Sequence, residues 1–329
     1  MGQKMAALKR GGKMLPITSR LCALLALTIA ALLTVACSAA SIAPPVEQET
    51  PAPTPEPRLA IGLLLSSLSD PLHLSMNAGA VESARRLDVD LVMRQADNEA
   101  GTQLEQIAEL LALEIDALIL NPVDSAAIGA GVQQANEAGV PVITVERRVR
   151  GARVTAHVAS DDITGGEMAA AYLVEQLREE GQVAELMGTP GTSAAQDRSA
   201  GFGRVLGDYE QIDVVARGVA YFDRDRARRT FAEILEEHAN LDAVFAHNDA
   251  MILGAIEAAE EAGRAQDIVF VGYDAMNEAV NAIEAGRLAA TVAQQPQEMG
   301  HLSVEIAVEE LRGGEVSEEL TVDLAVITR

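Results

Sequence analysis

The sequence predicts an α/β protein with two doubly wound parallel sheets, and three observations support this fold class. From residue 59 onward, short apolar runs alternate with helical patterns, the order expected of repeated βαβ units. The runs are nearly continuous in apolar residues, which indicates strands covered by helices on both faces. Ten such runs are many for one open sheet, whereas two sheets of about five or six strands are common. We therefore expect two sheets.

The predicted strands occupy ten segments of the chain. They span residues 59–65, 89–94, 117–120, 140–145, 154–158, 183–187, 213–219, 243–246, 268–271 and 288–293. After the strand at 117–120, Asp124 or Ser125 is placed to cap the next helix. Three glycine-containing segments are expected where the backbone turns sharply into a helix. They are Ala100-Gly101, Gly165-Gly166 and Gly191-Thr192-Ser193.

A nucleotide cofactor is not expected. No G-x-G-x-x-G follows the first predicted strand, and Gly201-Phe202-Gly203 lies within a helical pattern. The histidines show no metal-ligand spacing, so we expect no metal site either.

Residues 1–37 predict an export signal. Five basic residues, from Lys4 to Arg20, precede an uncharged apolar run at 21–36 that is short for a membrane span. The run stops at Cys37, and Leu33-Thr34-Val35-Ala36-Cys37 resembles a bacterial lipobox, in which the cysteine becomes the lipidated first residue. The alternative is an uncleaved anchor helix, which would leave the folded part outside the membrane as well.

Residues 38–57 are mostly Ala, Ser, Pro, Glu and Thr, a composition that predicts a flexible tether. Without the five basic residues of the signal, 20 Lys and Arg remain against 49 Asp and Glu, so the formal net charge becomes −29. Such a surface repels phosphate backbones, and nucleic acid is not an expected partner.

Polar and aromatic residues gather in short loops at the carboxyl ends of the predicted strands. Because these ends form the ligand crevice of an α/β sheet, residues far apart in the sequence are expected to converge. Charged donors and acceptors suit sugar hydroxyls, which both donate and accept hydrogen bonds, and aromatic faces cover the apolar C–H patches of a sugar ring. The loops are Ser66 to Asp70, Glu146-Arg147, Asp197-Arg198, Tyr221 to Asp223, His247 to Asp249, Tyr273-Asp274 and Gln294.

From about residue 58 to the end, specific motifs carry a family resemblance. They include Asn121 to Ser125, Pro141 to Arg147, Ala159 to Asp161, Gly191 to Ala195, Phe222-Asp223, Val244 to Asp249 and Leu288 to Gln294. In these motifs the chain resembles the periplasmic sugar-binding proteins of the ribose-binding type. The resemblance implies a type I periplasmic binding protein fold, in which two lobes joined by a three-segment hinge close on one sugar.

The resemblance also implies domain boundaries. The three crossings fall near Ser160-Asp161, Gln294-Gln295 and Asp323-Leu324. The N-terminal lobe is then 58–160 plus 295–323, and the C-terminal lobe is 161–294 plus 324–329.

Twelve residues match the family's ligand contacts. They are Ser66, Asp70, Leu72, His73, Glu146, Arg147, Arg198, Phe222, Asn248, Tyr273, Asp274 and Gln294. Asp274 with Arg147, Arg198 and Asn248 is expected to form a ring of polar groups around the sugar, with Phe222 as its stacking platform.

The chain departs from the ribose pattern at four of these positions. The family usually has aromatic residues at Leu72 and His73, Asn at Asp70 and Asp at Glu146. These changes remove stacking from one face and extend one carboxylate by a methylene. The expected ligand is therefore a small monosaccharide, either a ribose-like pentose or a related sugar or polyol, with a non-sugar metabolite as the alternative.

Several of these residues have purely structural explanations when taken alone. Asp223 and Asp249 precede helices and are expected to be N-caps, and Asn248 could belong to the second cap. Taken alone, Arg147 is explained by a solvated basic loop, and Arg198 is explained by a charged position on a helix surface. Tyr273 and Phe222 read equally well as core or rim aromatics.

The sequence thus predicts a lipid-anchored, extracytoplasmic, monomeric substrate-binding component of an ABC sugar importer, with a membrane permease as partner and no cofactor. The alternatives are a receptor that feeds a chemoreceptor or sensor kinase and the ligand core of a lactose-repressor-like regulator, for which no helix-turn-helix is expected. A glycosidase that uses Asp70, Glu146 or Asp274 is disfavoured, because arginine partners keep carboxylates ionised.

Overall fold

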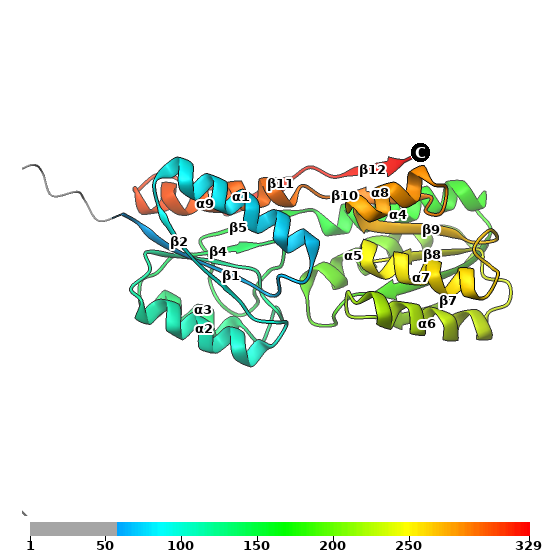
Figure 1. Ribbon diagram of the computed structural model, residues 1–329, viewed down its shortest axis with the longest axis horizontal. Coiled ribbons are helices and arrows are strands. Elements are labelled where there is room, and N and C mark those ends of the chain that lie inside the picture. Colours follow the sequence, from blue (N-terminus) through cyan, green and yellow to red (C-terminus); the bar gives the residue numbers. More distant parts are fainter. Residues whose placement is uncertain (1–57) are drawn as a thin grey trace, which may run out of the picture. The chain divides into compact units, whose positions relative to one another are not determined.

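Residues 58–329 are described by a computed structural model and form two β-sheets flanked by helices (Figure 1). The predicted export signal at 1–37, including Cys37, and the predicted tether at 38–57 lie outside the described residues. No helix within 58–329 is long and apolar enough to cross a membrane.

The described residues contain twelve strands and nine helices. The strands are β1 (Ala60–Leu65), β2 (Asp90–Gln95), β3 (Ala117–Leu120), β4 (Val142–Val145), β5 (Ala156–Ser160), β6 (Gly181–Met187), β7 (Ile212–Val219), β8 (Ala243–Ala246), β9 (Val269–Asp274), β10 (Ala290–Ala293), β11 (Glu319–Val322) and β12 (Ala325–Thr328). The helices are α1 (Pro71–Leu87), α2 (Ala100–Ala112), α3 (Gly129–Glu137), α4 (Asp162–Leu177), α5 (Ser193–Leu206), α6 (Arg224–Glu237), α7 (Asp249–Glu261), α8 (Asn277–Glu284) and α9 (Pro296–Leu311).

The first sheet has the strand order β11-β5-β4-β3-β1-β2, and all its neighbouring strands are parallel. Helices α1 and α9 pack against each other on one face, over a core that includes Ile61, Met76 and Met299. Helices α2 and α3 cover the other face through Ile107 and Val132. Cover on both faces explains why every side chain of β3 is buried and apolar.

The second sheet has the order β12-β10-β9-β8-β6-β7, and only β12 is antiparallel to its neighbour. Helices α6 and α7 cover one face through Phe231 and Ile252. Helices α4 and α5 cover the other through Leu173 and Phe202. The two doubly wound parallel sheets predicted from the sequence are confirmed.

The chain passes between the two sheets three times. It leaves the first sheet after β5, returns after β10 with α9, which packs on the first sheet, and crosses again between β11 and β12. In Figure 1, β11 and β12 run one after the other along the same side as α9. Where one lobe ends and the next begins within these crossings stays a prediction.

Three local predictions are wrong. The last two strands were not expected, because β11 and β12 are short, half-exposed edge strands without a continuous apolar run. Gly165-Gly166 lies inside α4 rather than at its start, since the pair allows close packing. Asp124 caps a turn that precedes α3, which begins only at Gly129.

Candidate functional site

Several predicted site residues lie at the carboxyl ends of strands in both sheets, and others lie on helices. Ser66 follows β1 and Glu146 follows β4 in the first sheet, whereas Asp274 ends β9 and Gln294 follows β10 in the second. This placement is where parallel α/β sheets bind ligands.

Helix starts supply further polar groups. The side chain of Asp70 caps α1, accepting a hydrogen bond from the backbone N–H of Leu72 at 2.9 Å. Asn248 caps α7 and accepts from the N–H of Met251 at 2.9 Å, and Asp223 caps α6. The cap prediction is confirmed for Asp223 and wrong for Asp249, which is the first residue inside α7.

Asp249 instead holds the loop after β9. Its carboxylate accepts hydrogen bonds from the hydroxyl of Thr291 at 2.7 Å and from the backbone N–H of Met276 at 2.7 Å. Asp274 lies at the end of β9 with a φ of 110°, and Ala275 follows with a φ of 56°. Left-handed backbone is costly outside glycine, so the fixed loop is what keeps Asp274 in place.

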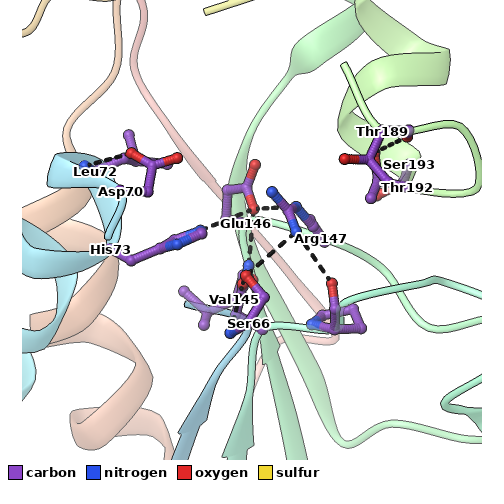
Figure 2. A network of polar contacts seen from close by, with 12 residues as sticks. Ser66, Asp70, Leu72, His73, Val145, Glu146, Arg147, Thr189, Thr192 and Ser193 are labelled. Carbon is purple, nitrogen blue, oxygen red and sulfur yellow. Dashed lines mark hydrogen bonds and ion pairs between the residues drawn. The ribbon is translucent and has the colours of Figure 1, made fainter. Parts of the chain in front are cut away.

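Glu146 is the centre of a buried polar cluster on the first sheet (Figure 2). Its Oε2 accepts a hydrogen bond from Nδ2 of Asn121 at 2.7 Å, and Nε of Arg147 lies 3.0 Å from the same oxygen. The ring of His73 approaches from the other side, with Nε2 4.0 Å from Oε2. Burial raises the pKa of Glu146, but the charges of Arg147 and Arg198 and the His73 ring outweigh it and lower the pKa to about 2.

Asn121 was not among the predicted site residues. Its Oδ1 accepts a hydrogen bond from the Ser66 hydroxyl at 2.6 Å, so it joins Ser66 to Glu146. The rule that found the other loops applies to it as well, because Asn121 follows the carboxyl end of β3.

Arg198 is the centre of a second buried cluster. It extends from α5, so the loop predicted at Asp197-Arg198 is wrong, and only 1% of its surface is exposed. Its Nε donates to Oδ1 of Asp162 at 2.8 Å and its Nη1 donates to the carbonyl of His247 at 2.6 Å. The guanidinium also lies 3.9 Å from the centre of the Tyr273 ring, whose hydroxyl donates to Asp162 at 3.1 Å. Asp162 is a further residue that sequence reasoning missed.

The same guanidinium reaches carboxylates that follow strands of both sheets. Its Nη2 lies 3.6 Å from Oε1 of Glu146, and its Nη1 lies 3.8 Å from Oδ1 of Asp274. Asp274 also accepts a hydrogen bond from Nε2 of Gln294 at 2.8 Å. Arg198 therefore connects the two clusters.

Burial raises the pKa of two carboxyls near Arg198. The pKa of Asp162 is raised to about 6 by its burial, which outweighs the attraction of Arg198. The pKa of Asp274 is raised well above its usual value, mainly by burial, and the charge of Asp70 adds to the effect. Fewer cations lie near these two carboxyls than near Glu146, so the cost of burying their charged form is offset less.

Phe222 lies across the cleft from Arg147, with the guanidinium carbon 5.3 Å from the ring centre. Its backbone is left-handed, with a φ of 60°, which is uncommon for a bulky residue. The ring rests on Gly188, where an added Cβ would come within 2.1 Å of it. The position of the ring is thus set by close packing on a glycine.

Two cavities adjoin these side chains. One of about 550 Å³ is lined by Asp70, His73, Arg147, Phe222 and Asn248, among others. A second, of about 410 Å³, is lined by Leu72, Asp274 and Gln294. A larger hollow of about 900 Å³ lies at the amino ends of β9 and β10, far from these clusters, and none of the buried charged groups described above lines it.

Four of the predicted residues line neither of these two cavities. Ser66, Arg198 and Tyr273 lie beneath the cavity walls and orient other groups, and Glu146 lines a separate hollow of about 260 Å³ with Asp162 and Ser160. Arg147 and Arg198 are buried, so the solvent-exposed explanations for both are wrong.

Three buried nitrogens of these clusters make no hydrogen bond within residues 58–329. They are Nε2 of His73, Nη2 of Arg198 and Nε of Arg147, the last of which still forms an ion pair with Glu146 at 3.0 Å. Leaving a buried donor or acceptor unsatisfied costs about 1–3 kcal/mol. The arrangement therefore suits an oxygen-rich ligand that both accepts and donates hydrogen bonds. No group of three or more His, Cys, Asp or Glu side chains within the described residues is arranged to hold a metal ion.

Comparison with known proteins agrees with this geometry. Residues 61–315 match the family described as a periplasmic binding protein domain. The ribose import binding protein RbsB of Bacillus subtilis is 36% identical over 303 residues, covering 92% of this chain and 97% of that protein. The Escherichia coli RbsB is 36% identical over 269 residues, covering 82% of this chain and 90% of that protein.

Solved structures are similar throughout the described part. A solute-binding protein of an ABC transporter from Bacillus halodurans, with bound myo-inositol, is 32% identical with a TM-score of 0.79, covering 82% of this chain and 94% of that one. Its counterpart from Actinobacillus succinogenes, with bound D-allose, is 29% identical with a TM-score of 0.78, covering 82% of this chain and 98% of that one.

Proposed function

The chain belongs to the periplasmic binding protein family, and we propose that it is the sugar-binding component of an ABC importer, working outside the cytoplasm. Its relatives bind substrates rather than transform them. Proteins named for ribose, D-allose and xylitol are among those relatives, and similar structures hold D-allose and myo-inositol. The ligand we propose is accordingly a small monosaccharide or polyol.

One observation carries the proposal. Buried charged groups from the two sheets meet around Arg198, which lies 3.6 Å from Glu146 and 3.8 Å from Asp274. Buried side-chain nitrogens that make no hydrogen bond among the described residues belong to both clusters. A polyhydroxylated ligand satisfies such groups, because each hydroxyl accepts from an arginine and donates to a carboxylate.

The mechanism follows from contributions by both lobes. A ligand held by Arg147 and His73 on one side and by Phe222 and Asn248 on the other favours the closed arrangement of the lobes. Hinge closure of this kind converts binding into a change of surface that a permease distinguishes. No bond of the sugar is made or broken.

The twelve predicted residues divide into two roles under this proposal. Asp70, His73, Arg147, Phe222 and Asn248 contact the ligand from one cavity, and Leu72, Asp274 and Gln294 from the other. The remaining four act at or behind the walls. They are Ser66, Glu146, Arg198 and Tyr273.

The position in the cell is also part of the proposal. Lipidation of Cys37 would anchor the protein to the membrane, with 38–57 as the tether and 58–329 as a monomeric binding domain beside a permease. Mass spectrometry of the protein from membranes tests this. A diacylglyceryl thioether on Cys37 supports the anchor, and a chain that retains residues 1–36 contradicts it.

Binding is tested by isothermal titration calorimetry with D-ribose, D-allose, xylitol and myo-inositol. We expect one of them to bind, and Arg147→Ala or Asp274→Ala to abolish the signal. Arg287→Gln is the control, because Arg287 pairs with Glu260 on the surface. If none of the four compounds binds and a non-sugar metabolite does, the proposal is contradicted.

A further inference from the structure

The cavity that contains Arg147 and Phe222 continues beyond the predicted ligand contacts. Its outer part is lined by Asp97, Asn98 and Glu99 after β2 on the first sheet. On the side of the second sheet it is lined by Tyr221 and Arg226. We call these five residues the cleft rim. The whole cavity, of about 550 Å³, lies in the range of sites that hold drug-sized ligands, about 300–1,000 Å³.

Tyr221 gives the cleft rim an aromatic surface. All nine Phe and Tyr side chains lie within residues 58–329, and Tyr221 is the one that is largely exposed, at 48%. The guanidinium carbon of Arg226 lies 4.8 Å from its ring centre. A stacked arginine orders the ring and reduces the entropy lost when a ligand binds to it.

The backbone on both sides of the cleft rim is held in the left-handed region. Tyr221 and Phe222 have φ values of 57° and 60°, and Asp97 and Asn98 have 50° and 61°. The N–H of Asn98 donates to the carbonyl of Ser66 at 2.8 Å, which ties this loop to the site. Two consecutive bulky aromatics in this region are costly, and such strain concentrates at ligand-binding positions.

The charges of the cleft rim identify the chemistry it accepts. Arg224 also lines this side of the cavity but is paired with Glu257 and Glu278. Asp97 and Glu99 therefore face Arg226 as the cation without a carboxylate partner of its own among residues 58–329, so an anionic group such as phosphate is disfavoured. Asn98 offers both a donor and an acceptor. An uncharged ring with an apolar face and polar edges fits this combination.

We propose that the cleft rim is a second subsite, which binds a neutral ring joined to the sugar in the inner cleft, so that the protein takes a glycoside in preference to the free sugar. The inference rests on the proposed sugar-binding function. The attached ring is a second sugar or an aromatic aglycone, and both present an apolar face to Tyr221.

Calorimetric titration of the purified full-length protein tests the subsite. The probes are D-ribose and D-allose together with their methyl, phenyl and D-glucosyl glycosides in both anomers. We expect a ring-bearing glycoside to bind about tenfold more tightly than the methyl glycoside of the same anomer. A preference for phenyl identifies an aromatic aglycone, and a preference for glucosyl identifies a second sugar.

Variants separate the subsite from the inner cleft. Tyr221→Ala is expected to remove the tenfold preference, and Tyr221→Phe is expected to keep it, because the ring is the platform. Leu113→Ala, which truncates an exposed apolar side chain at the end of α2, is the control and should leave every affinity unchanged.

The outcomes separate the two proposals. If a free sugar binds but no ring-bearing glycoside exceeds its methyl glycoside, the subsite is wrong and the sugar-binding function stands. If the preference survives in Tyr221→Ala, the assignment to Tyr221 is wrong. If only xylitol or myo-inositol binds, the subsite is wrong and the proposed function stands. If no free sugar, polyol or glycoside binds, both proposals fail.

Discussion

The two sheets contribute buried carboxylates to the cleft in different electrostatic states. Glu146, after the first sheet, is surrounded by Arg147, His73 and Arg198, and its pKa is lowered to about 2 despite burial. Asp162 and Asp274, on the side of the second sheet, share Arg198 as their cation, and burial raises the pKa of both. All three carboxyls are buried to nearly the same extent. The number of cations near each one therefore determines whether its pKa is lowered or raised.

The difference has a functional consequence. The cluster around Glu146 is internally balanced. Its shape is held by hydrogen bonds from Asn121 to Glu146 and from Ser66 to Asn121, with a longer one from Arg147 to Ser66. The cluster around Arg198 has an excess of acidic groups and gains more from a ligand hydroxyl that donates to Asp274. We therefore expect the second cluster to be the more sensitive to substitution and to pH.

Removal of Arg198 should have the largest effect on this contrast. Arg198→Met leaves Asp162 and Asp274 buried without a cation, and breaking a buried pair in this way costs about 3–5 kcal/mol. Urea unfolding measures the loss, and calorimetry should show that sugar binding disappears with it.

Arg204→Met is the matched control for Arg198→Met. Arg204 lies on the same helix, α5, with 63% of its side chain exposed and Glu167 as its partner. Exposed pairs contribute about 0–1 kcal/mol. Equal losses in the two variants would contradict the special role of Arg198.

The pH dependence of unfolding should differ between the two clusters. The pKa of Asp162 is raised to about 6 in the folded protein, so its contribution to stability is complete below its unfolded value and is lost as pH rises through about 6. A difference of about two pKa units corresponds to about 2–3 kcal/mol. The free energy of unfolding of the wild type, minus that of Asp162→Asn, should fall by this amount between pH 4 and pH 7.

Glu146 supplies the opposite sign. Its lowered pKa gives stability that is present above its unfolded value and is lost as pH falls from about 4.5 toward 2. Other carboxyls with a lowered pKa, such as Asp161 and Glu319, titrate in the same range in both proteins. The free energy of unfolding of the wild type, minus that of Glu146→Gln, should therefore fall as pH falls over this acidic range. If both differences in the free energy of unfolding, the one for Asp162 and the one for Glu146, changed with pH in the same direction, the contrast between the clusters would be contradicted.

Close packing of α4 on Tyr273 offers a smaller perturbation of the second cluster. At Gly165 an added Cβ would come within 2.0 Å of the Tyr273 hydroxyl, so Gly165→Ala must displace the ring from Asp162 and Arg198. Overpacking of this kind costs about 1–3 kcal/mol.

Gly203→Ala provides the control for Gly165→Ala. Gly203 lies inside α5, and nothing lies within 4 Å of the position of its added Cβ. Alanine there should stabilise the protein by about 0.5–1 kcal/mol, because it restricts the unfolded chain. Thermal unfolding of both variants would show shifts of opposite direction, and a stabilised Gly165→Ala would contradict the packing argument.

The sequence predicts the sheets better than it predicts the clusters. Strands such as β3 and β8 are continuous apolar runs and are recognised directly, whereas β11 and β12 are short edge strands whose exposed residues interrupt any such run. Arg198 was predicted in a loop, but it lies inside α5. A charged residue within a helix has no local signal that separates a surface position from a buried one, so its burial could not be predicted.

Asp162 shows why part of the site could not be predicted from the sequence. It follows the helix cap Asp161, and two adjacent acidic residues at a helix start are explained by capping alone. Its contacts with Arg198 and Tyr273 join residues 36 and 111 positions away. Only the folded chain brings these three groups together.

Substitution of Asn248 tests whether one side chain both caps α7 and contacts the ligand. It is expected to give the smallest change in stability. Its Oδ1 caps α7 through the N–H of Met251, which leaves the amide N–H₂ for the cavity. Asn248→Asp keeps the cap, since aspartate caps as well as asparagine, and should change the free energy of unfolding by less than about 0.5 kcal/mol. It removes the donor, so calorimetry should show sugar affinity falling by about tenfold or more.

Asn248→Ala completes the comparison, because it removes both the cap and the donor. It should weaken binding to a similar extent and also lower stability by about 1 kcal/mol. If Asn248→Asp binds sugar as well as the wild type, the amide contributes nothing to the ligand. In that case the second sheet would act in the cleft through Asp274, Gln294 and Phe222, and Asn248 would serve the helix alone.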